Sequence, residues 1–198
     1  MKKKAVAVVM TAVMALGMVS AVSVQAGIED KTLIVGFDAE YPPYGYMDEN
    51  GEYTGFDLEL AQAVCDLEGW ELEKKPINWD SKDMELNSGS IDCIWNGFTM
   101  NGREDDYTFS EPYVDNSQVI VVADDSGIEK LTDLAGKTVG VQAASAALDL
   151  LQSEEEGGQK ELADTFGALN EFADYNTAFT ELQAGALDAL AIDVGVAK

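Results

Sequence analysis

Histidine is absent from the 198-residue chain, and arginine occurs once, at Arg103. The lack of histidine excludes Ser-His and Cys-His nucleophilic systems and metal sites built on imidazole. The two cysteines, Cys65 and Cys93, are too few for a structural zinc site without histidine. They could form a disulfide in an exported protein or lie as small buried apolar side chains, and the sequence leaves both possibilities open.

Basic residues are scarce as well, since 12 lysines and arginines face 37 acidic residues, for a net charge of -25. Such a surface repels nucleic acid, whose binding depends on cations that neutralise phosphates, so no nucleic-acid partner is expected. Hydrophobic residues make up 46% of the chain, enough for a packed core. Apolar patterns typical of strands and helices continue throughout, which excludes a disordered acidic tail.

Residues 1–26 have the features of a secretory signal peptide. Three lysines open the chain, an apolar run follows to about Val22, and Val24-Gln25-Ala26 has the small residues of a cleavage site. We therefore predict cleavage after Ala26 and export to the periplasm, the cell surface or the medium, with a membrane anchor as the alternative. The remainder has 9 basic and 37 acidic residues, a net charge of -28, and contains no further apolar run long enough to span a bilayer.

Periodic apolar patterns in the rest of the chain alternate between strand and helix. They predict helices at 56–67, 82–88, 144–152 and 177–183, and strands at 32–37, 70–77, 91–95, 117–124, 137–142, 171–175 and 187–192. This alternation predicts the α/β class, with parallel strands covered by helices. The pattern restarts after the strand at 117–124, so we expect two lobes, at residues 27–117 and 118–198.

Several polar and aromatic residues follow predicted strands directly, and in open α/β sheets ligands bind at that edge. Tyr41 and Tyr44 follow the first strand, Trp79 the second, and Thr99 and Arg103 the third. Arginine presents a planar fork of donors that matches a carboxylate, so this edge is a candidate carboxylate clamp. The alternative is a local ion pair on a solvated turn, with Glu104, Asp105 or Asp106.

The chain resembles the extracytoplasmic substrate-binding proteins of polar amino-acid ABC transporters. The matching runs, which together cover about residues 32–198, are 35–43 (VGFDAEYPP), 55–61 (GFDLELA), 97–99 (GFT) with Arg103, 109–113 (FSEPY), 134–142 (LAGKTVGVQ) and 187–193 (LDALAID). The resemblance implies a type II periplasmic-binding-protein-like fold whose two α/β lobes close on an amino acid. It also implies a monomer with no cofactor that delivers its ligand to the membrane permease of an ABC importer.

The resemblance also implies roles for individual residues. Arg103 would hold the α-carboxylate, and Asp193 with the Gly97 carbonyl would hold the α-ammonium. Backbone N–H groups at Thr99, Ser145 and Ala146 would assist Arg103. The side chain of the ligand would lie between the aromatic rings of Tyr41 and Trp79, with other polar residues near its far end. The full expected site comprises Arg103, Thr99, Gly97, Asp193, Ser145, Ala146, Tyr41, Trp79, Asp38, Tyr44, Asn96 and Gln142.

Three features depart from the family pattern. The loop between Thr99 and Arg103 is one residue shorter than usual, and Ala146 stands where a hydroxyl residue is common. The sequence stops at Lys198, before the segment that completes the second lobe in family members, so we expect that lobe to be incomplete.

Asp38, Glu40 and Asn96 near the aromatic pair favour a polar ligand over an aliphatic one, and a neutral ligand such as glutamine or cystine over a basic one. Two other functions remain open from the sequence. The same fold hosts secreted dehydratases of cyclic dicarboxylates, for which Glu40 or Asp38 could act as the acid or base. A ligand-sensing ectodomain would need a membrane span after the second lobe. We expect a binding protein and not an enzyme.

Overall fold

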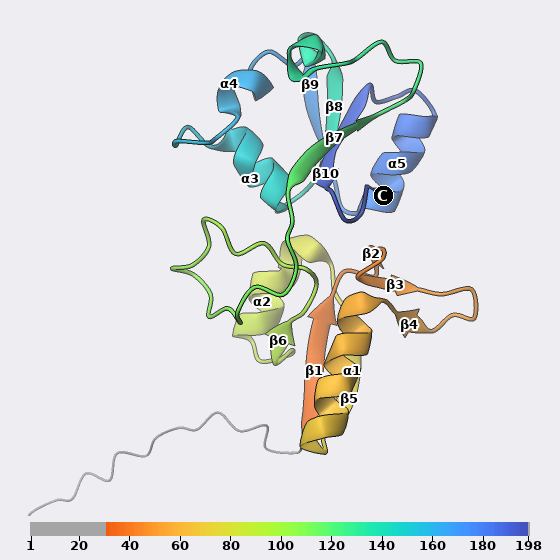
Figure 1. The fold of residues 1–198 in the computed structure, drawn as a ribbon, viewed down its shortest axis with the longest axis vertical. Helices are drawn as coiled ribbons and strands as arrows, with labels where there is room; N and C mark the ends of the chain where they lie inside the picture. Colours follow the sequence, from red (N-terminus) through yellow and green to blue (C-terminus); the bar gives the residue numbers. More distant parts are fainter. Residues whose placement is uncertain (1–30, 198) are drawn as a thin grey trace, which may run out of the picture.

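The computed structural model describes residues 31–197. The predicted signal peptide lies outside this range. The described residues form two lobes, and the chain passes from the lower to the upper one just before β7 (Gln118–Val122) (Figure 1). Lobe 1 contains β1–β6, α1 and α2, and lobe 2 contains β7–β10 and α3–α5. The predicted two-lobed α/β fold is confirmed, and the predicted boundary at 117/118 falls at the start of β7.

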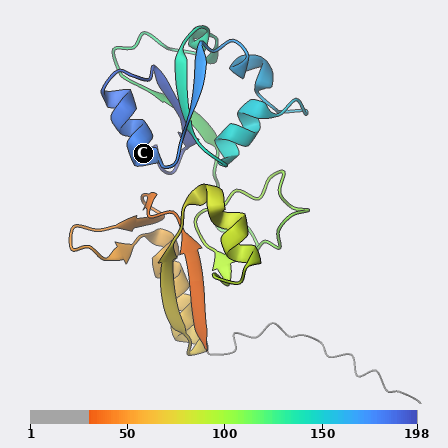
Figure 2. The same cartoon turned by 180° about the vertical axis from the view of Figure 1, so that it is seen from behind.

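The main sheet of lobe 1 is parallel, in the order β5-β1-β6. Figure 2 shows its strands running side by side. The strands are β1 (Thr32–Phe37), β5 (Glu71–Pro76) and β6 (Cys93–Ile94). Helix α1 (Phe56–Glu68) buries Leu58, Ala61 and Cys65 and ends where Gly69 adopts a left-handed φ of 68°. A second helix, α2 (Lys82–Asn87), follows the 3-10 turn Trp79–Ser81. Both cysteines are free.

A small antiparallel sheet lies beside α1 at the end of lobe 1 nearest lobe 2 (Figure 1). It consists of β2 (Glu40–Tyr41), β3 (Gly45–Met47) and β4 (Tyr53–Thr54). A turn that contains Asn50 and Gly51 joins the antiparallel strands β3 and β4. This sheet brings Tyr41 and Tyr44 to the interlobe face, where they are buried.

Lobe 2 has a four-stranded mixed sheet in the order β7-β10-β8-β9. Strands β8 (Thr138–Gln142), β9 (Ala168–Phe172) and β10 (Ala189–Asp193) are parallel, and β7 runs antiparallel to β10. Helices α3 (Ala146–Gln152) and α4 (Lys160–Ala163) lie on one side of the sheet, and α5 (Tyr175–Gln183) on the other (Figure 1).

Two predicted strands were placed or sized wrongly. The strand expected at 171–175 is β9, which ends at Phe172, because the side chain of Asp174 accepts from the Thr177 backbone N–H at 2.7 Å and caps α5. The strand expected at 91–95 is reduced to two paired residues, Cys93 and Ile94. Helix α4 was not predicted at all; at four residues it is too short to show an apolar period.

The described residues form three apolar clusters, one within each lobe and one between the lobes. The interlobe cluster joins Tyr41 and Tyr44 of lobe 1 to Tyr175, Leu190 and Ile192 of lobe 2. Tyr41 stacks on Tyr44 with ring centroids 5.4 Å apart and lies 6.0 Å from Tyr175. The lobes are therefore in direct contact through aromatic side chains. Within residues 31–197, no helix combines the length and apolar character needed to cross a bilayer.

Candidate functional site

A small cavity lies between the lobes and collects most of the expected site residues. Its volume is about 20 Å³, room for about one water molecule. It is lined by Tyr41, Trp79, Asn96, Gly97, Phe98, Thr99, Arg103, Gln142, Ala146 and Asp193. Residues from both lobes thus face one space, as expected for strands that end at a common edge. Of the twelve expected residues, Asp38, Tyr44 and Ser145 are absent from this lining.

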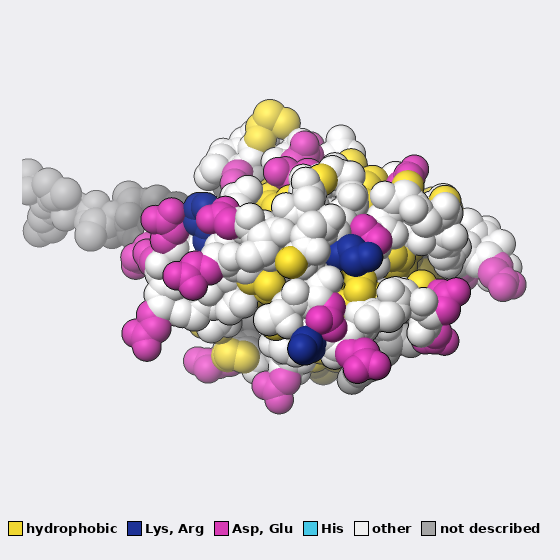
Figure 3. Space-filling model, turned by 90° about the horizontal axis from the view of Figure 1, so that it is seen from above, with side chains coloured by type: hydrophobic (Ala, Val, Ile, Leu, Met, Phe, Trp, Pro, Cys, Tyr) yellow, Lys and Arg dark blue, Asp and Glu magenta, His cyan; other side chains and the backbone are white. Residues whose placement is uncertain are grey.

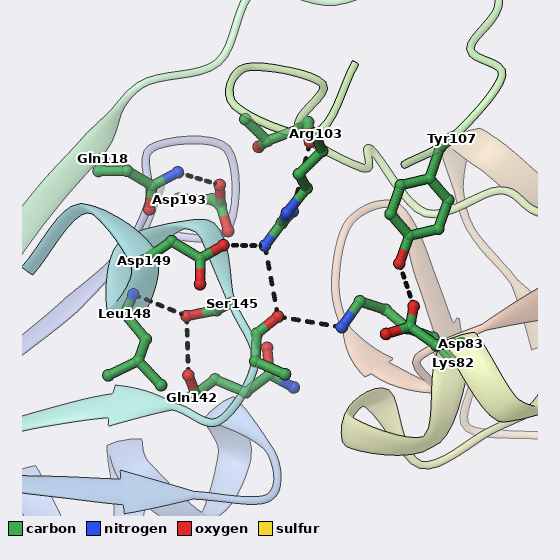
Figure 4. A network of polar contacts seen from close by, with 12 residues as sticks. Lys82, Asp83, Arg103, Tyr107, Gln118, Gln142, Ser145, Leu148, Asp149 and Asp193 are labelled. Atoms are coloured by element: carbon green, nitrogen blue, oxygen red, sulfur yellow. Dashed lines mark hydrogen bonds and ion pairs between the residues drawn. The ribbon is translucent and has the colours of Figure 1, made fainter. Parts of the chain in front are cut away.

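Arg103 belongs to the loop that follows β6, and its side chain is only 12% exposed. Its Nη1 donates to the Thr99 carbonyl at 3.3 Å, and its Nη2 donates to the Ala144 carbonyl of lobe 2 at 3.4 Å. Its ion-pair partner is Asp149 on α3, with Nη2 2.6 Å from Oδ2 (Figure 4). The guanidinium also lies 4.8 Å from the centre of the Phe98 ring. Among the described residues, Arg103 therefore does not form the local ion pair with Glu104, Asp105 or Asp106.

Asp193 is the last residue of β10, and it is buried. Its Oδ1 accepts from Gln118 Nε2 at 2.6 Å and from Asn116 Nδ2 (Figure 4 shows the first of these). Gln118 is held opposite Asp193 by the antiparallel register of β7 and β10. These two amides orient the carboxylate, and sequence reasoning missed both. A strand-pairing prediction for β7 and β10 would have found Gln118.

The two expected aromatic residues, Tyr41 and Trp79, form walls of the cavity together with Phe98. Trp79 packs edge-on against Phe98, with centroids 5.4 Å apart, and Lys82 Nζ lies 5.2 Å from its ring. Tyr41 reaches the cavity from β2, and its pKa is raised by burial and then by the charge of Asp193. Tyr44, expected in the site, packs in the interlobe cluster behind Tyr41 instead.

A polar contact joins the lobes beside the cavity. Gln142 Nε2 of lobe 2 donates to Asp38 Oδ2 of lobe 1 at 2.6 Å and to the Ala173 carbonyl at 3.1 Å. The backbone N–H of Asp38 donates to Asn96 Oδ1 at 3.0 Å. Burial raises the pKa of Asp38, although hydrogen bonds from Glu40 and Gln142 oppose the shift. The contact places Asp38 beside the cavity, next to the lining residues Asn96 and Gln142.

The turn between β8 and α3 contributes the remaining expected residues. Ser145 caps α3, because its hydroxyl accepts from the Leu148 backbone N–H at 3.2 Å and donates to the Gln142 carbonyl at 2.7 Å. Both hydrogen bonds of the Ser145 side chain are therefore made within lobe 2. The neighbouring Ala146 lines the cavity and has no hydroxyl group. On the facing loop, Thr99 Oγ1 accepts from Asn116 Nδ2 at 3.4 Å, and Gly97 has a φ of 56°.

Lys82 and Asp149 are two further charged residues at this edge that sequence reasoning missed. Lys82 Nζ donates to the Ala144 carbonyl at 3.2 Å, and Arg103 donates to the same oxygen. Two cations of lobe 1 thus bind one carbonyl of lobe 2 (Figure 4). Burial lowers the pKa of Lys82, and the charge of Asp83 opposes the shift. No sequence signal marks either residue, because their proximity depends on how the lobes meet. Within residues 31–197 no cluster of potential metal ligands occurs.

Residues 33–193 match the model of the bacterial extracellular solute-binding proteins, family 3. The chain belongs to this family. The L-cystine-binding protein TcyJ of Escherichia coli K12 is 32% identical over 193 residues, which cover 91% of this chain and 69% of TcyJ. The arginine-binding extracellular protein ArtP of Bacillus subtilis is 35% identical and is matched over 85% of this chain and 63% of its own length.

The fold matches solved structures of the same kind. An ABC uptake transporter substrate-binding protein from Streptococcus pneumoniae, solved with bound histidine, has a TM-score of 0.79 and 35% sequence identity. The match covers 84% of this chain and 68% of that protein. The chain thus spans about two thirds of the length of these relatives, and the relatives are named as binding proteins.

Proposed function

We propose that this protein captures a polar amino acid between its lobes and delivers it to the permease of an ABC importer. The observation that carries the proposal is that Arg103 and Asp193 line the same cavity from opposite lobes. A cationic fork from lobe 1 and a buried carboxylate from lobe 2 are the complements of the carboxylate and ammonium of a free amino acid. Family membership supports the same function.

Binding in this cavity requires the lobes to separate first. At about 20 Å³ the space is far smaller than any amino acid. An entering amino acid would replace direct interlobe contacts such as Gln142 to Asp38 and Arg103 to the Ala144 carbonyl. Its side chain would lie between Tyr41 and Trp79. Closure of the lobes would then be driven by contacts that the ligand makes to both of them at once.

The ligand is proposed to be polar and, by a small margin, neutral rather than basic. Asn96 and Gln142 line the cavity with donors and acceptors, and Asp38 is hydrogen-bonded to both of them beside it, which suits an amide or a second polar group. Relatives named for cystine, arginine and histidine support the polar class. Glutamine and cystine are therefore our first candidates.

The proposal includes export of the chain. Family 3 proteins are extracellular, and the basic and apolar pattern of residues 1–26 provides the signal. Mass spectrometry of the exported protein should give an N-terminus near Gly27, whereas a soluble protein retaining Met1 would contradict this. Figure 3 shows acidic side chains scattered over the face seen from above, which disfavours a nucleic-acid partner.

Isothermal titration calorimetry against the twenty amino acids and cystine tests the function. We expect binding of at least one polar amino acid and none of a sugar such as maltose. Tight binding of leucine or of the sugar, with no polar amino acid bound, would refute the proposal. Incubation with prephenate tests the enzymatic alternative, and we expect no turnover.

A further inference from the structure

An ion pair crosses the interlobe cleft at the atoms that the ligand is proposed to use. Asp149 Oδ2, on α3 of lobe 2, lies 2.6 Å from Arg103 Nη2 of lobe 1 (Figure 4). The Asp149 side chain is 59% exposed, so it approaches the buried guanidinium from the solvent side of the cleft. The same nitrogen donates to the Ala144 carbonyl at 3.4 Å. The fork is therefore engaged by acceptors of the protein itself.

We propose that Asp149 lowers the ligand affinity by pairing with Arg103 across the closed lobes, a contact that must break when the lobes separate and that the carboxylate of an amino acid then replaces. The inference rests on the proposed function. Asp149 is thus a built-in competitor that contacts the binding residue from the opposite lobe. Its carboxylate has the same chemistry as the α-carboxylate of the ligand.

Displacement is favoured over shared binding by charge and by exposure. Two carboxylates on one guanidinium would repel each other, whereas Asp149 can return to solvent at little cost because it is already more than half exposed. Lys82 offers a nearby cation after the exchange. Lys82 Nζ donates to the same Ala144 carbonyl as Arg103 does, at 3.2 Å, which places this second cation beside the guanidinium.

A purely local role for Asp149 is the competing explanation. It lies in the first turn of α3, where an acidic side chain stabilises a helix through the helix dipole. That role would change the stability of lobe 2 but would not change ligand affinity in a salt-dependent way. Affinity and its salt dependence therefore separate the two explanations.

The test is calorimetry of the parent and of Asp149→Asn with L-glutamine, L-cystine, L-histidine and L-arginine as probes. Asp164→Asn is the matched control, because Asp164 forms an ion pair with Lys160 on α4, also in lobe 2, and loses the same charge. We expect Asp149→Asn to bind about two- to fivefold more tightly than either the parent or the control, the range of a partly exposed ion pair. Asp149→Glu, which keeps the charge, should bind as the parent does.

Salt provides the second readout. Raising the ionic strength from about 0.1 M to 1 M shortens the Debye length from about 10 Å to 3 Å. The affinity gap between Asp149→Asn and the parent should shrink over this range. If Asp149→Asn binds a probe as tightly as or more weakly than the parent, the inference is overturned and the proposed function stands. If neither the parent nor any variant binds any amino acid, the proposed function fails and the inference falls with it.

Discussion

Replacement of Asp57 by asparagine should change how the stability of the protein depends on pH. Asp57 lies in the first turn of α1 and is fully buried. Its Oδ1 accepts from Tyr113 Oη at 3.0 Å, while its Oδ2 finds no partner among the described residues. Tyr113 Oη in turn accepts from the Gly97 backbone N–H at 3.3 Å. The carboxylate thus supports the glycine that lines the cavity.

Burial raises the pKa of Asp57 to about 6, with the hydrogen bond from Tyr113 acting in the opposite direction. The ordinary value of 3.8 applies to the unfolded chain. Between these values the folded state binds more protons than the unfolded state, so the free energy of unfolding falls as pH rises. The stabilisation is complete below about pH 4 and lost above about pH 6. Two pKa units correspond to about 3 kcal/mol.

Asparagine has no proton to lose, so this decline should disappear in Asp57→Asn. Urea unfolding at pH 4, 5, 6, 7 and 8 measures it, and the variant should gain about 3 kcal/mol on the parent between pH 4 and pH 7. Asp48→Asn is the control. Hydrogen bonds from Glu52 and Asn50 lower the pKa of Asp48, so the titration of Asp48 changes the free energy of unfolding only below the pH range of these measurements. Parallel stability curves for Asp57→Asn and the parent would refute the reasoning.

Three further substitutions follow from the packing and the site. Gly55 has a φ of 124°, and a Cβ there would lie 2.3 Å from the Tyr44 carbonyl oxygen. Gly55→Ala should therefore lower the free energy of unfolding, measured by urea titration, by at least about 1–3 kcal/mol. A Cβ at Gly195 would lie 2.0 Å from Tyr44 Oη across the lobes, so Gly195→Ala should enlarge the radius of gyration in solution scattering and weaken amino-acid binding. Unchanged scattering would contradict this. Asp193→Asn should weaken binding by about 2–5 kcal/mol in calorimetry, and an unchanged Kd would remove Asp193 from the site.

The order and type of most elements could be predicted, because each lobe buries apolar residues at regular spacing. The helical spacing of Phe56, Leu60, Val64 and Leu67 located α1 but not its buried face, because the structure buries Leu58, Ala61 and Cys65 and exposes Phe56 and Leu67. Strand β9 was placed three residues too late, because Phe172 and Tyr175 are both aromatic, whereas the capping bond of Asp174 makes Tyr175 the first residue of α5. Strand β6 was overestimated because Ile91 beside it is apolar and buried but does not pair with β1.

The predicted site residues divide according to what holds them. Residues that follow strands directly, such as Arg103 and Trp79, line the cavity because parallel strands bring their ends together. Tyr44 packs in the interlobe cluster instead, and the side chain of Ser145 caps α3, whereas the role expected of Ser145 was that of its backbone N–H. Asp149 escaped prediction because its contact with Arg103 exists only when two separately folded lobes meet.

The central claim is that Arg103 binds the carboxylate of an amino acid, and calorimetry of Arg103→Lys and Arg103→Ala tests it most directly. Lysine keeps the charge but loses the planar fork, so it should fail to restore binding. Loss of a desolvated, hydrogen-bonded charge partner costs about 2–5 kcal/mol, which is more than a tenfold rise in Kd. Circular dichroism should show both variants folded, because Arg103 belongs to none of the apolar clusters. A folded Arg103→Ala that binds an amino acid as tightly as the parent would contradict the account.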